Sequence, residues 1–149
     1  MKRLFVFAAA AFGLLAVSSC GDDTSHLKPY TEERATVNPD PVLEYVVNLG
    51  DTLNPEWAFS VKLYEQQKSL QYRVLFKYKE VEGEKIFSYP NLGFMPLPGL
   101  RRQGEDSLAC VVGFYDADST FMDLRLIKVE NGNLIYRHLK EYQVGEGKK

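Results

Sequence analysis

The stretch Trp57-Ala-Phe-Ser-Val-Lys-Leu-Tyr64 alternates large apolar side chains with smaller or polar ones, and Gln71-Tyr-Arg-Val-Leu-Phe-Lys-Tyr78 does the same. Successive side chains of a β-strand point to opposite faces of the sheet, so a period of two predicts a strand with one apolar face. Both stretches therefore predict strands that bury one face in a core. We expect this core, on facing sheet surfaces, to include Trp57, Phe59, Val74, Phe76, Val112 and Leu124.

Alternation, apolar runs and turn signals predict five more strands around this pair. The run 108–115 is apolar on both faces, as in a central strand that is covered on both sides. Glu82-Gly83 and Asn131-Gly132 predict hairpin turns, and Asn-Gly is the stronger signal because a type I′ turn needs positive φ at both central residues. The predicted strands are 42–49, 57–64, 71–79, 85–89, 108–115, 121–129 and 134 to about 144.

These strands make the predicted fold class all-β, because no stretch has a convincing helical period. About seven short antiparallel strands joined by tight turns are typical of a β-sandwich. A small β-barrel is the alternative, although a barrel that encloses a cavity usually has more strands. We expect the strands to pair as successive hairpins, with residues 107–144 forming a three-stranded meander.

Composition limits the possible classes of protein. The chain has 149 residues, of which 45% are hydrophobic and 26% charged, as in a single globular domain. Its 18 Lys and Arg against 20 Asp and Glu give a net charge of −2, which excludes a strongly basic nucleic-acid-binding surface. The chain contains only 2 cysteines, which excludes a disulfide-rich scaffold.

The N-terminus has the pattern of an export signal. A basic start at residues 1–3 precedes an uncharged apolar run at 4–17, which is shorter than the ~20 residues of a membrane-spanning helix. The residues that follow, Val17-Ser-Ser-Cys20, resemble the lipobox of bacterial lipoproteins. The resemblance implies that residues 1–19 are a signal peptide and that Cys20 is lipidated and becomes the mature N-terminus. The alternative is an ordinary secretory signal with an incidental Cys.

The residues after Cys20 predict a tether. Gly21-Asp-Asp23 resembles the acidic signal of Bacteroidota lipoproteins exported to the cell surface, which implies lipid anchoring in the outer membrane, at the cell surface or on the periplasmic face. Residues 20–41 are polar and contain three prolines. Such a segment buries too little surface to offset its ordering entropy, so we expect a flexible tether there and a folded domain at 42–149.

The segment 90–106 is the most unusual part of the predicted domain. It is expected to be a loop, and loops longer than about 12–15 residues are uncommon and often functional. Apolar anchors beside a pair of arginines suit the core and rim of an interface, which makes this segment a candidate partner-binding site. The alternative is that the loop covers an open end of the sandwich and buries its own apolar side chains. The candidate residues are Phe94, Met95, Leu97, Arg101 and Arg102.

The chain offers little for catalysis. Cys110 lies in an apolar strand and is expected to be a small buried hydrophobe rather than a nucleophile, and His138 is expected to be an ordinary polar strand residue. Asp116-Ala-Asp118 is better explained as a turn than as a fragment of a calcium site. We therefore expect no enzymatic activity, no cofactor and no metal.

Tyrosines are abundant in the predicted strands, at Tyr72, Tyr78, Tyr136 and Tyr142. An exposed row of them would suit stacking on sugars, whereas cross-strand aromatic pairing within the fold is the favoured alternative. The sequence thus favours a membrane-anchored envelope lipoprotein that is a non-enzymatic binding or assembly subunit of an envelope protein complex. Its expected partners are the membrane, through Cys20, and an envelope protein, with no nucleic acid. The alternative function is a surface lipoprotein that binds a carbohydrate or another small ligand.

Overall fold

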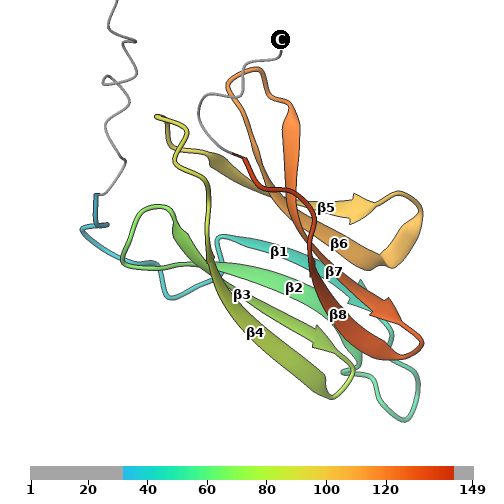
Figure 1. Ribbon diagram of the computed structural model, residues 1–149. Coiled ribbons are helices and arrows are strands. Elements are labelled where there is room, and N and C mark those ends of the chain that lie inside the picture. Colours follow the sequence, from blue (N-terminus) through green and yellow to red (C-terminus); the bar gives the residue numbers. More distant parts are fainter. Residues whose placement is uncertain (1–31, 143–149) are drawn as a thin grey trace, which may run out of the picture.

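The computed structural model describes residues 32–142, which contain eight strands and no helix (Figure 1). The lipobox, Cys20 and most of the predicted tether lie outside the described residues. No helix among residues 32–142 has the length and hydropathy needed to cross a membrane. The strands are β1 (Leu43–Asn48), β2 (Ala58–Glu65), β3 (Gln71–Tyr78), β4 (Val81–Ser88), β5 (Leu97–Gln103), β6 (Asp106–Tyr115), β7 (Phe121–Glu130) and β8 (Asn133–His138).

The strands form two four-stranded antiparallel sheets, each a meander in chain order. The first sheet has the order β1-β2-β3-β4 and the second the order β5-β6-β7-β8. The sheets stack face to face, with β1 against β5 and β6, and β4 against β8 (Figure 1). They do not close into a barrel, so the predicted all-β sandwich is confirmed, with eight strands where about seven were expected.

The core lies between the two sheets and contains five of the six residues expected there. Phe59, Val74 and Val112 are fully buried, and Phe76 and Leu124 are nearly so. Trp57 differs, because it precedes β2 and is only half-buried, with the Lys79 ammonium 4.5 Å from its ring centroid. It therefore lies at the end of the sandwich rather than inside it.

Two predicted hairpin turns have opposite outcomes. Asn131 and Gly132 both have positive φ, 51° and 78°, and join β7 to β8 as predicted. The turn predicted at Glu82-Gly83 is wrong, because Tyr78 pairs with Val81 and the chain turns at Lys79 instead, with a φ of 53°. Gly83 lies inside β4, where the ring of Phe76 fills the space that a Cβ would need.

Residues 32–34 differ from the flexible tether that the sequence predicts. Glu33 forms a bridge with Lys68, and the Arg34 guanidinium donates to the carbonyls of Gln66, Lys68 and Ser69 in the turn between β2 and β3. The same guanidinium donates to the Tyr72 hydroxyl and pairs with the Glu65 carboxylate. Arg34 can do this because guanidinium offers five N–H donors in a rigid plane. We call residues 32–34 the Arg34 strap.

Candidate functional site

The segment 90–106, predicted as a single loop, contains strand β5. The chain crosses from β4 to the second sheet through residues 89–96 and then pairs with β6 from Leu97 onward. Tyr89 anchors the crossing: its ring is buried, and its hydroxyl donates to the Gly113 carbonyl at 2.8 Å. The prediction failed because Pro98 and Gly99 break the alternation, yet β5 is an edge strand, where proline is tolerated.

The structure separates the five candidate partner-binding residues. Phe94 is half-buried and packs against the core, as the covering role predicts. Met95 and Leu97 are 40% and 65% exposed. Arg101 and Arg102 are both exposed but point to opposite faces of β5, because neighbouring strand residues alternate. The segment therefore serves partly as a cover and partly as free surface.

Leu97 and Arg101 lie on the outer face of the β5–β8 sheet, the face that points away from the core. Arg102 lies on the other side of the strand, where its Nε donates to the Gly104 carbonyl at 2.9 Å. Leu97 pairs with Tyr115, and Arg101 pairs with Val111. The two candidate residues that share this face are thus flanked by an aromatic and an apolar side chain of β6.

A glycine pair gives this face its shape. Gly99 and Gly113 are directly opposite each other on β5 and β6. The ring of Phe121 lies over both, so that a Cβ on Gly99 would be 2.6 Å from Phe121 Cε2 and one on Gly113 would be 2.7 Å from Phe121 Cζ. Only glycine leaves room for the ring at these two positions.

Two neighbours complete the aromatic surface around Phe121. The Tyr115 ring meets it edge to face at 5.2 Å, and the Arg101 guanidinium lies 4.9 Å from its centroid. Such a cation–π contact contributes about 0.5–1 kcal/mol at exposed sites and holds the cation in a fixed place. We call Phe121, Tyr115, Arg101 and the two glycines the Phe121 platform.

An open hollow of about 480 Å³ lies beside the platform. The residues that line it include Arg101, Arg102 and Lys140 and one acidic residue, Asp123, so the local charge is positive even though the Arg102 side chain lies on the other side of β5. We call it the basic hollow; it is lined by Arg101, Arg102, Gln103, Gly104, Val111, Phe121, Asp123, Leu139 and Lys140.

The outer faces of the two sheets differ in chemistry. Under the Phe121 platform, Ala109, Val111 and Leu126 form a small buried apolar cluster on the side away from the main core. The outer face of the β1–β4 sheet instead carries the ion pairs Lys62–Glu44 and Arg73–Glu84. Ion pairs of this kind are usual on solvated faces, whereas a layered apolar face with an exposed Leu is usual at interfaces.

The residues considered for chemistry do not form a reactive site in the described chain. Cys110 is fully buried, and burial raises the pKa of its thiol to about 12, so the predicted buried hydrophobe is confirmed. His138 is exposed at the end of β8. Asp116 accepts backbone N–H bonds from Asp118 and Thr120, as the predicted turn requires. Residues 32–142 contain no cluster of three or more His, Cys, Asp or Glu that could hold a metal ion.

Tyr72, Tyr136 and Tyr142 pair with other aromatic rings. Tyr142 lies beyond β8, which ends at His138 rather than near residue 144 as predicted. Tyr72 meets Tyr89 edge to face at 5.0 Å, and Tyr136 stacks on Phe76 at 5.9 Å. Tyr142 meets Phe114 at 5.7 Å. Three of the four tyrosines considered for sugar stacking are therefore engaged in aromatic contacts with the core, as cross-strand and inter-sheet pairing predicts.

The sequence analysis identified Leu97 and Arg101 as candidate partner-binding residues, but it did not identify Phe121 and Tyr115.

No family model, curated protein or solved structure matches the chain.

Proposed function

We propose that this protein is a lipid-anchored envelope lipoprotein that acts as a non-enzymatic binding or assembly subunit and docks through the outer face of its β5–β8 sheet. The observation that carries the proposal is the contrast between the two outer faces. One carries two ion pairs beside its exposed Val46 and Ile86, whereas the other presents the Phe121 platform, the basic hollow and an exposed Leu97.

The partner that fits this face is a protein surface with an apolar projection bordered by carboxylates. Leu97 and the edge of the Phe121 ring offer apolar contact, while Arg101, Arg102 and Lys140 line the hollow beside them. Complementary charge steers encounter and fixes the register of docking, and the apolar centre provides the stability of the complex. Charge complementarity therefore favours an acidic partner over a basic one.

Membrane attachment through Cys20 is the second part of the proposal and rests on the lipobox resemblance. Several acyl chains on one residue are sufficient for stable anchoring, at ~0.8 kcal/mol per buried CH₂. The Arg34 strap adds one structural consequence, because it ties the chain to the β1–β4 sheet at the β2–β3 turn. The chain thus leaves from one layer of the sandwich, while the proposed docking face belongs to the other.

Capture of the full-length chain from membranes tests the docking face. Leu97→Ser removes the exposed apolar anchor, and Val46→Ser is the matched control because Val46 is 52% exposed on the other sheet. We expect recovery of the specific partner to fall at least about fivefold for Leu97→Ser, as for an interface anchor, and to stay unchanged for Val46→Ser. Equal recovery of every co-purifying protein by both variants would contradict docking at this face.

Metabolic labelling with a fatty-acid analogue tests the anchor. Cys20→Ala should abolish labelling, because no other residue of the lipobox-like segment carries a thiol. Cys110→Ala is the control and should leave labelling unchanged, since Cys110 is buried. Equal labelling of Cys20→Ala and wild type would exclude the lipoprotein assignment.

A further inference from the structure

Arg125 occupies an unusual place at the side of the sandwich where β4 and β8 face each other. The pairing of β6 with β7 shifts by one residue after Val112, so that Leu124 and Arg125 together face one residue of β6. Bulges of this kind re-aim side chains and are frequent beside functional sites. Leu124 enters the core, while the Arg125 guanidinium lies 5.9 Å from the Phe87 ring of β4.

The guanidinium of Arg125 is largely unpaired within the described chain. Its Nη1 donates to the Leu124 carbonyl at 2.9 Å, and its buried Nε has no partner among the described residues. Arg34 shows the contrast, because all five of its N–H groups lie near acceptors. Unpaired buried donors are rare in folded proteins and call for an explanation, such as a bound water or ion.

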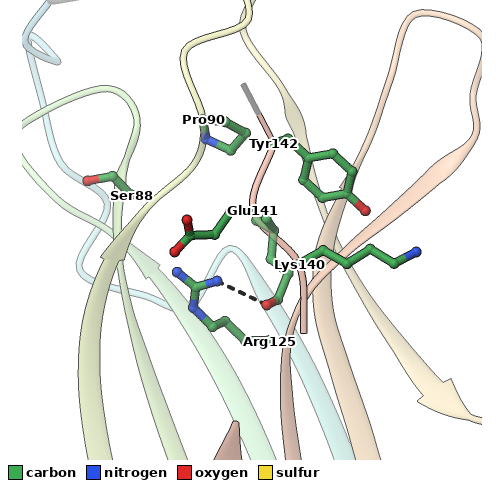
Figure 2. A pocket seen from close by; sticks show the side chains of 7 residues that line it. Ser88, Pro90, Arg125, Lys140, Glu141 and Tyr142 are labelled. Atoms are coloured by element: carbon green, nitrogen blue, oxygen red, sulfur yellow. Dashed lines mark hydrogen bonds between the residues drawn. The ribbon is translucent and has the colours of Figure 1, made fainter. Parts of the chain in front are cut away.

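Two hollows meet at this guanidinium. The upper hollow, of about 220 Å³, is shown in Figure 2 and is lined by Ser88, Pro90, Leu124, Arg125, Lys140, Glu141 and Tyr142. The lower hollow, of about 350 Å³, is lined by Lys85, Ile86, Phe87, Ser88, Arg125, Tyr136 and His138. The described ion pairs do not include one between Glu141 and Arg125.

The two hollows differ in charge. In Figure 2 the Arg125 guanidinium points toward the carboxylate of Glu141, while the Lys140 amine points away from it. The upper hollow therefore already contains a carboxylate. The lower hollow is lined by Lys85, Arg125 and His138 and by no acidic residue.

The lower hollow combines basic groups with aromatic walls. Arg125 and His138 are directly opposite each other on β7 and β8, an arrangement of basic residues that does not itself stabilise a sheet. Phe87 and Tyr136 form the walls, and stacking on Phe76 together with an edge contact to His138 holds the Tyr136 ring in place. A few convergent polar groups in a mostly apolar concavity are the usual composition of a small-ligand site.

We propose that the lower hollow binds the oxyanion group, a carboxylate or a phosphate ester, of a small organic acid. In the complex the guanidinium of Arg125 turns from Glu141 toward the lower hollow, where the oxyanion accepts from its N–H groups, Nε included, which satisfies the orphan donor. Lys85 and His138 line the same hollow. The body of the ligand lies between Phe87 and Tyr136, so a flat or apolar body fits best.

Calorimetric titration of the full-length chain in detergent tests the site with three probes. Benzoate and phenyl phosphate carry the two oxyanions on the same ring, and benzamide is the neutral counterpart of benzoate. We expect benzoate, phenyl phosphate or both to bind and benzamide not to bind. Tighter binding of benzoate assigns a carboxylate ligand, and tighter binding of phenyl phosphate assigns a phosphate ester. The site is excluded if neither anion binds, or if benzamide binds as tightly as benzoate.

Substitutions test whether the anion binds at Arg125. Arg125→Gln should weaken the bound anion by about tenfold or more, as expected for loss of a charge-assisted hydrogen bond. Arg137→Gln is the control, because Arg137 is an arginine of the neighbouring strand β8 that pairs with Glu130 and lines neither hollow. If Arg125→Gln fails to fold, Lys85→Gln replaces it, since Lys85 is exposed at the edge of the hollow and its loss should still weaken binding severalfold. Unchanged affinity in the folded variant would overturn the proposal.

Leu97→Ser should leave anion binding unchanged, since Leu97 lines neither hollow. The oxyanion site and the docking face can therefore fail or succeed independently.

Discussion

Phe121 owes its position on the outer face to two residues that have no side chain. Gly99 and Gly113 lie on the consecutive strands β5 and β6, and the pairing of these strands brings them opposite each other. A Cβ on Gly99 would meet only the far end of the Phe121 ring and the Tyr115 ring, whereas one on Gly113 would also meet the Met122 carbonyl. The two glycines therefore have different tolerance for a methyl group.

Replacing each glycine with alanine should distinguish an effect on the shape of the Phe121 platform from an effect on the free energy of unfolding. Gly113→Ala forces the β6–β7 backbone apart and should cost about 1–3 kcal/mol of unfolding free energy, as overpacking does. Gly99→Ala displaces only the Phe121 and Tyr115 rings and should cost less, while partner capture falls. Urea unfolding followed by tryptophan fluorescence measures both variants. An equal loss of stability would mean that the ring has no freedom to move.

Cys110 gives a second prediction for a single residue. Its thiol is fully buried, and burial raises its pKa to about 12, so the reactive thiolate is scarce at neutral pH. Iodoacetamide at pH 8 should leave Cys110 unmodified in the native protein and should alkylate it in urea, as peptide mass spectrometry would show. Rapid alkylation of the native protein would place Cys110 in an exposed or activated environment instead.

Whole elements were predictable where local pattern and burial agree. The strict alternation of β2 and β3 and the Asn131-Gly132 turn each carry their own signal, so their positions follow from a few adjacent residues. β5 does not, because the segment Leu-Pro-Gly-Leu-Arg-Arg-Gln lacks alternation and becomes a strand through its pairing with β6. For the same reason the candidate site was only half predictable: Leu97 and Arg101 are recognisable as exposed anchors, but Phe121 joins them only through tertiary pairing.

The Arg34 strap gives a prediction for an element. Arg34→Ala removes the guanidinium donors of the Gln66 and Ser69 carbonyls and of the Tyr72 hydroxyl, while the Lys68 carbonyl keeps the Gln71 N–H as a donor. Loss of a hydrogen-bond partner costs about 1–3 kcal/mol for a buried group. These groups are only part-buried or exposed, so the loss should lie near the lower end of that range and should release residues 32–41 before the sandwich unfolds. Hydrogen exchange should therefore speed up at 32–41 and at the β2–β3 turn, with little change in β6 and β7. Val46→Ser serves as the control, and unchanged exchange at 32–41 would show that the backbone bridge alone holds the strap.

Phe76, a core residue that contacts both sheets, gives a further prediction. Phe76 of β3 lies over Gly83 of β4 and stacks on Tyr136 of β8, so one ring joins three strands across the sandwich. Phe76→Ala should lower the free energy of unfolding by about 3–5 kcal/mol, from lost burial and the cavity left behind. Denaturant unfolding measures the loss. A barely changed midpoint would mean that Tyr136 and its neighbours collapse into the space.

At the scale of the whole molecule, the buried side chains of Tyr72, Tyr89 and Cys110 make the free energy of unfolding depend on pH in the alkaline range. Burial raises the pKa of Tyr72 and Tyr89 above the ordinary tyrosine range, and it raises that of Cys110 to about 12. Below about pH 7.5 all three groups are protonated in both the folded and the unfolded chain, because the ordinary pKa of a cysteine is about 8.5, so they contribute no pH dependence there. Above that pH the unfolded chain loses protons that the folded chain keeps, which favours unfolding.

As far as these groups are concerned, stability should therefore be constant up to about pH 7.5 and should fall increasingly from about pH 8 upward, by at most ~1.4 kcal/mol per pH unit for each group. Urea midpoints measured at about pH 7, 9 and 10.5 give the slope. Cys110→Ala removes the group that ionises first in the unfolded chain, so the decline of this variant should begin about one pH unit later, near the ordinary tyrosine pKa. A midpoint that stays flat to pH 10.5 would mean that water reaches these side chains in the folded state. The two sheets would then be packed less tightly than their shared aromatic contacts, from Tyr72 through Tyr89 to Phe114, require.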